Sequence, residues 1–186
     1  MTTINLKELA YTTLSDSREF GKKMVNIYRV ASHLGFTYDT VRDSDYLGKI
    51  HRDYDGYELG VSEKLSSAER NFETATLLAF ALLQPNLPKV LPVGFAIQHA
   101  KDGNDIGMRM ATHLAGILMA YSFTPKELSY VDHPKGELKL AKLAQKKGIP
   151  TRVLLRRMAE VIDGTNIDFD NSISMVNVND SKKKKG

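Results

Sequence analysis

The sequence predicts an α+β fold that is mainly helical, carries a small antiparallel sheet and ends in a pair of short helices. Three observations support this class. Apolar residues recur at helical spacing in several long segments, and three strand-like segments gather within residues 36–61. The turn Gly148-Ile149-Pro150 then separates two short amphipathic stretches. With 186 residues, 42% of them hydrophobic, the chain is long enough to bury its own core.

The first part of the chain predicts one helix and then the sheet. A helix over residues 20–34 would end at Gly35. Its apolar stripe holds Phe20, Met24, Ile27, Ala31 and Leu34. The strands are expected at residues 36–41, 47–52 and 57–61, with Asp55-Gly56 as a hairpin turn between the last two.

A central helix is expected after the sheet. Ser66 and Glu69 have the spacing of a capping box, in which two side chains satisfy free backbone donors at a helix start. The helix would stop before Pro85, and beyond Leu77 it is apolar on nearly every face, which is typical of a buried helix. A proline-broken connection follows, up to residue 105, and we expect it to be the most mobile element.

The C-terminal part predicts a long helix from about residue 105 to Tyr121 and a short one that opens at Thr124-Pro125. Two further helices are expected at 137–147 and 151–162, arranged like a helix-turn-helix. The chain thus divides into a core at 1–131, a helical pair at 132–163 and a polar tail at 164–186. The tail is rich in Asn and Asp before its lysines, so we expect it to be disordered.

Composition excludes several classes of protein. The chain has no cysteine, which rules out disulfides, thiolate metal sites and cysteine nucleophiles. Lysines 182–185 account for the whole excess of 26 Lys and Arg over 22 Asp and Glu, so the body of the protein is neutral. No apolar run is long enough to span a membrane and no secretory signal is recognisable, so we expect a cytoplasmic protein.

The order of elements over residues 35–119 resembles that of the ImmA/IrrE metallopeptidase-like family. The resemblance is carried by the stretch YELGVSEKLS, residues 57–66, and by Ala68-Glu69-Arg70-Asn71-Phe72. These look like the edge strand of that family and the entry to its active-site helix. The resemblance implies a core similar to that of a zinc peptidase.

The catalytic motif of that family is missing. In H-E-x-x-H two histidines at i and i+4 bind zinc, and the glutamate between them activates the bound water. Here Thr76 and Phe80 stand at the ligand positions and Leu77 at that of the general base. Met110 stands where the family carries its third ligand, a glutamate. We therefore expect a pseudopeptidase with no catalytic residue, no zinc and no cofactor, in which core side chains fill the zinc position.

A replacement metal site is the alternative for this region. His99 and His113 would form it with Asp102 or Asp105 if the proline-broken connection folds back over the second helix. Isolated histidines near Asp and Gly are usually solvated, however, and no two histidines stand at i and i+4.

The resemblance also implies a function, because the family typically acts on helix-turn-helix repressors, often in phages and other mobile elements. We expect a non-catalytic regulator that binds such a repressor, as an antirepressor or a repressor modulator. The candidate anchors for the partner lie in the proline-broken connection: Val90, Leu91, Val93 and Phe95. The alternative interpretation packs these side chains against the protein's own core.

A DNA-binding regulator is the second hypothesis. The helical pair at 137–162 carries the candidate contacts Lys147, Arg152, Arg156 and Arg157. Arg152 and Arg156 share one helix face at i and i+4, as base-reading side chains do. Asn and Gln are absent from 151–162, however, and basic side chains are common on solvated helix faces.

Overall fold

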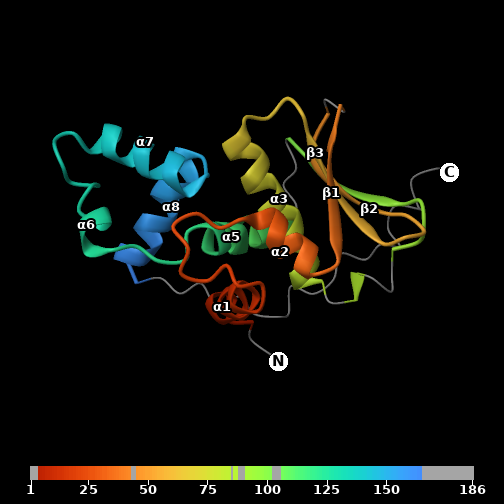
Figure 1. The fold of residues 1–186 in the computed structure, drawn as a ribbon. Helices are drawn as coiled ribbons and strands as arrows, with labels where there is room; N and C mark the ends of the chain where they lie inside the picture. The colour runs from red at the N-terminus through yellow and green to blue at the C-terminus, as the bar shows by residue number, and fades with distance from the viewer. Residues whose placement is uncertain (1–3, 43–44, 85, 88–90, 102–105, 165–186) are drawn as a thin grey trace.

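A computed structural model describes residues 4–42, 45–84, 86–87, 91–101 and 106–164, which form an α+β fold. The α+β class predicted from the sequence is confirmed. Figure 1 shows the sheet at one end of the molecule and α7 and α8 at the other, with α3 and α5 between them. The helices are α1 (Leu6–Asp16), α2 (Ile27–His33), α3 (Ser67–Leu83), α5 (Ile106–Met119), α6 (Pro125–Leu128), α7 (Gly136–Lys147) and α8 (Thr151–Ile162). The strands are β1 (Phe36–Val41), β2 (Tyr46–Arg52), β3 (Tyr57–Ser62) and β4 (Ala96–Ala100).

The sheet is mixed, and the expectation of a purely antiparallel sheet is wrong. Its order is β1-β3-β2-β4, with β2 antiparallel to both neighbours and β1 parallel to β3. The β2–β3 hairpin folds back so that β3 enters between β1 and β2. β3 is therefore an interior strand, which differs from the edge strand that the family resemblance implied for residues 57–66. The outermost strands of the described sheet are β1 and β4.

Strand β4 lies in the proline-broken connection, for which the sequence predicts no regular structure. Of that connection, residues 85, 88–90 and 102–105 lie outside the described part of the chain. The described part reaches the sheet because Ile97 pairs with Ile50 and His99 with Gly48 of β2. Arg52 extends this contact by donating from its guanidinium to the Leu91 carbonyl at 2.6 Å.

The predicted helix over 20–34 is helical only in α2, and an irregular connection separates α2 from α1, a helix that was not predicted. α1 ends at Asp16, and α2 begins after Asn26, whose side chain accepts from the Arg29 amide. The carboxylate of Glu19 explains the break, because it is fully buried and accepts from the Asn26 amide at 3.0 Å. Phe20 and Met24 belong to this connection and are exposed. Their helical spacing with Ile27 was coincidental.

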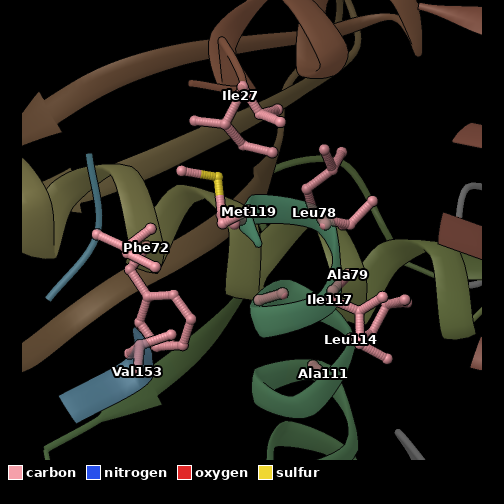
Figure 2. Close-up of a cluster of buried hydrophobic side chains, with 14 of the residues drawn as sticks. Ile27, Phe72, Leu78, Ala79, Ala111, Leu114, Ile117, Met119 and Val153 are labelled. Carbon is pink, nitrogen blue, oxygen red and sulfur yellow. The ribbon is translucent and has the colours of Figure 1, made fainter. Parts of the chain in front are cut away.

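Helix α3 is the centre of the fold, as predicted. It starts after Ser66, whose hydroxyl accepts from the Glu69 amide, and every residue from Phe72 to Ala81 is buried. The sheet lies on one side of α3 and α5 on the other. Figure 2 shows this packing, in which Leu78 and Ala79 of α3 lie beside Leu114 of α5.

The C-terminal helical pair has the predicted bounds to within one residue at each end. Gly148 takes the left-handed conformation that ends α7, at φ 69°, and its carbonyl accepts from Asn71 of α3 at 3.1 Å. The buried side chains of Ile149, Leu154 and Met158 dock the pair on the core. The tail at 165–186 and its lysines lie outside the described residues. None of the described helices has the length and apolarity needed to cross a membrane.

Phe80 is buried in α3, so its truncation should leave a cavity in the core. We expect Phe80→Ala to lower the free energy of unfolding by about 3 to 5 kcal/mol, measured by chemical denaturation. Phe95→Ala is the matched control, because this phenylalanine is 57% exposed and should lose no more than about 0.5 kcal/mol. Equal losses in the two variants would contradict the buried position of Phe80.

Candidate functional site

Two adjoining cavities lie where α3, α5 and α8 meet. The smaller has a volume of about 220 Å³ and reaches the sheet at Leu47 and His99. The larger has a volume of about 310 Å³ and runs under α8 to Glu160. Both are lined by Phe72, Thr112 and Arg152, so they lie side by side, and we call the two together the interhelical groove.

The four positions of the family's catalytic motif fall beside this groove or in the core below it. Leu77 and Phe80 are buried in the core, and Met110 is also buried, as expected. Thr76 lines the smaller cavity, but its hydroxyl donates to the Phe72 carbonyl at 3.0 Å. Apolar side chains offer no zinc ligand, and the described residues contain no group of three His, Asp or Glu that could hold a metal ion. A zinc ion of the family type therefore does not fit here.

The smaller cavity is not apolar, which corrects the expectation that core side chains fill the whole cleft. Glu73 of α3 is only 5% exposed, and its Oε1 lies 2.7 Å from Nδ1 of His99 on β4. Gly48 of β2 makes room for this pair, because a Cβ there would lie 3.1 Å from that same oxygen and 2.9 Å from Leu77. Sequence reasoning missed Glu73. Its spacing of three residues from Thr76, on the same helix face, was the available signal.

The larger cavity has its own buried ionic cluster. His113 of α5 is 4% exposed, and its Nδ1 lies 3.0 Å from Oε1 of Glu160 on α8. The other oxygen of Glu160 accepts from the guanidinium of Arg157, and Arg156 Nε lies 3.2 Å from Oε1. Burial lowers the pKa of His113, and the charges of Arg156 and Arg157 lower it further, whereas Glu160 opposes the shift.

Arg157 is the arginine of this cluster that is buried, between α8 and α5. Its stem crosses α5 at Gly116, where a Cβ would lie only 3.1 Å from Arg157 Cδ. Its Nε is buried and has no hydrogen-bond partner in the described part of the chain. Arg157 lines the larger cavity, and its buried Nε–H lacks an acceptor in the described residues, which is energetically costly.

Arg152 joins α8 to α3 at the point where the two cavities meet. Its guanidinium makes a bidentate pair with the Glu69 carboxylate, with Nη2 2.8 Å from Oε2. This hydrogen bonding raises the pKa of Arg152. Glu69 therefore binds α8, whereas the capping box expected from the sequence would have turned it toward the backbone of Ser66.

The two histidines proposed for a replacement metal site pair with different carboxylates. His99 contacts Glu73 in the smaller cavity, and His113 contacts Glu160 in the larger one. Asp102 and Asp105, the other ligands of that hypothesis, lie outside the described residues.

The candidate DNA contacts on the helical pair differ in exposure. Lys147 and Arg157 are buried, so neither presents a free charge to a DNA groove. Arg152 and Arg156 are exposed, but they pair with Glu69 and Glu160. Each basic side chain of α8 therefore already has a role within the protein.

The candidate partner anchors also differ in their exposure. Leu91 is buried and packs within the protein, as the alternative interpretation held. Val93 and Phe95 are 40% and 57% exposed just before β4, where a partner can reach them. Val90 lies outside the described residues.

No protein-family model matches the chain, and a search of curated proteins finds no match either. The resemblance to the ImmA/IrrE family therefore depends on the motif residues and the order of elements.

The purified protein should carry no stoichiometric zinc, because Thr76, Leu77, Phe80 and Met110 do not provide a ligand set. Elemental analysis after mild dialysis checks this expectation. About one zinc per chain that is lost in His99→Ala or His113→Ala would instead establish the replacement site.

The lowered pKa of His113 should make stability depend on pH. The unfolded chain binds a proton near the ordinary pKa of 6.5, whereas the folded chain binds it only at lower pH. The contribution of His113 is thus complete above pH 6.5 and declines as the pH falls below it, by at most about 1.4 kcal/mol per pH unit. Denaturation curves between pH 5 and 8 measure this slope. It should be shallower in His113→Gln and unchanged in His133→Gln, at an exposed histidine; equal slopes would contradict the assignment.

Proposed function

We propose that this chain is a non-catalytic regulatory protein that binds a protein partner, a helix-turn-helix transcriptional repressor. The observation that carries the proposal is the contrast between the catalytic positions and the groove beside them. Leu77 and Phe80 occupy two of the four catalytic positions and are packed into the core. The interhelical groove remains open next to them. A protein that keeps a cleft without its reactive groups is suited to holding a segment of its partner without cleaving it.

The lining of the groove supports a partner segment with apolar and acidic side chains. Phe72 and Val153 provide apolar walls in the larger cavity, and both are labelled in Figure 2. Arg156 and Arg157 line the same cavity, and the buried Arg157 Nε lacks an acceptor within the described chain. A carboxylate from the partner would pair with the exposed guanidinium of Arg156 in a charge-assisted hydrogen bond.

The repressor is the preferred partner because of the family resemblance. That family typically acts on helix-turn-helix repressors of phages and mobile elements. A relative without catalytic groups would sequester or modulate the repressor and leave its chain intact. Binding at the groove would be aided by the exposed Val93 and Phe95 just before β4.

The test mixes the protein with repressors encoded in the same phage or mobile element and follows three readouts: co-elution, repressor length and operator occupancy. We expect co-elution with an intact repressor and altered occupancy. Cleaved repressor would overturn the non-catalytic assignment. Salt-sensitive operator binding by this chain alone would favour the DNA-binding alternative.

Variants locate the partner site. Arg156→Ala removes an exposed cation from the groove and should weaken repressor binding by about tenfold, in the range of a moderate interface contact. Lys142→Ala is the matched control, because Lys142 is an exposed cation of α7 that lines neither cavity. If both variants bind the repressor as the unchanged protein does, the groove is not the partner site.

A further inference from the structure

A separate cavity of about 460 Å³ lies on the other side of the helical pair, between the α1–α2 connection, the segment after α5, α6 and α7. In Figure 1 the connection after α1 runs toward the end of the molecule that holds these helices. This cavity is distinguished by its positive charge, because five lysines and a single carboxylate, that of Glu127, line it. We call the cavity the lysine pocket; its lysines are Lys22, Lys23, Lys126, Lys146 and Lys147.

Lys147 is the buried member of the lysine pocket. It sits at the C-terminal end of α7 and is only 9% exposed. Its Nζ reaches one carbonyl, that of Ser122, at the long distance of 3.4 Å, and lies 5.1 Å from the centre of the Phe123 ring. Burial lowers its pKa, since these partners replace only part of the lost hydration. An anion in the cavity would supply the missing compensation.

The carboxylates near the pocket leave most of its positive charge unbalanced. Glu127 caps its own helix, with Oε2 accepting from both the amide and the hydroxyl of Thr124. Glu19 pairs with Lys22 at 2.7 Å. Within the described residues no carboxylate comes within ion-pair distance of Lys23, Lys126 or Lys146, so these three cations are available to a ligand.

The size and walls of the cavity narrow the class of ligand. A volume of about 460 Å³ is in the range of sites for small molecules. Phe123 and Tyr130 line it beside the lysines and provide ring surfaces. The cations converge on a hollow, whereas a nucleic-acid backbone is usually held along an extended basic stripe.

We propose that the lysine pocket binds a small polyphosphorylated molecule of the nucleoside di- or triphosphate class. The phosphates lie among the lysines, and the base contacts the aromatic wall. This inference does not depend on the repressor hypothesis, because the pocket shares no lining residue with the interhelical groove.

Isothermal titration calorimetry of the full chain tests the proposal with ATP, ADP, pyrophosphate, sulfate and a 20-base-pair DNA duplex as probes. We expect ATP and ADP to bind more tightly than pyrophosphate, and sulfate to bind weakest. No binding of ATP at millimolar concentration would overturn the proposal. Equal affinities for sulfate and ADP would indicate an adventitious ion only, and tighter binding of the duplex would indicate a nucleic-acid site.

Variants connect binding to the pocket. The double variant Lys126→Gln and Lys146→Gln changes exposed side chains and should weaken ATP binding by about tenfold or more. Lys147→Met tests the contribution of the buried ammonium group to ATP binding. If the Lys147→Met protein does not fold, the double variant of exposed lysines decides whether the pocket binds ATP. Lys142→Gln on α7 and Arg156→Ala in the groove are controls that should retain ATP affinity. Loss of affinity in the controls equal to that in the double variant would contradict the assignment.

Discussion

The constraint on which this structure depends is that α3 has no solvent-facing side from Phe72 to Ala81. Any polar side chain in that stretch must find its partner inside the protein, because an unsatisfied buried polar group is costly. Thr74 and Thr76 meet the requirement by donating to carbonyls one turn earlier, those of Arg70 and Phe72. Glu73 cannot do so with a carboxylate, and it requires His99 from β4.

Because Glu73 needs His99 as its partner, its burial also depends on the pairing of strands β4 and β2. His99 reaches the carboxylate because β4 pairs with β2 next to Gly48, the residue whose missing side chain leaves space for Glu73. The five-residue strand β4 is thereby tied to the buried central helix α3. The smaller cavity of the groove is the space that remains around this pair. The cleft beside Thr76 and Leu77 is therefore not uniformly apolar.

Elements with strong local signals could be predicted from the sequence. The cap at Ser66, the proline after Thr124 and the turn at Gly148 each act within a few residues, and the helices they begin or end have the expected bounds. The burial of Leu77 and Phe80 also followed from pattern alone. The break before α2 could not be predicted from the sequence. It depends on the buried carboxylate of Glu19, and the helical spacing of apolar residues from Phe20 onward indicated a continuous helix instead.

The missed features all depend on contacts between distant parts of the chain. β4 is defined by its pairing with β2, and the mixed sheet by the entry of β3 between β1 and β2. The groove needs α8 docked on α3 and α5, so the roles of Glu69 and Glu160 were not visible in the sequence. Spacing along one helix reports which side chains share a face, but not which element that face meets.

The helical pair shows why its basic residues were ambiguous in the sequence. Lys147 and Arg152 are only five positions apart, yet the turn at Gly148 directs them to different cavities. Arg157, on the same helix as Arg152, is buried against α5 with Glu160. Some of these cations therefore dock α8 on the core, and others line the interhelical groove or the lysine pocket. They do not form one continuous face. A basic helix-turn-helix pattern indicates DNA binding only where the cations stay exposed together, and here the packing of α8 on the core separates them.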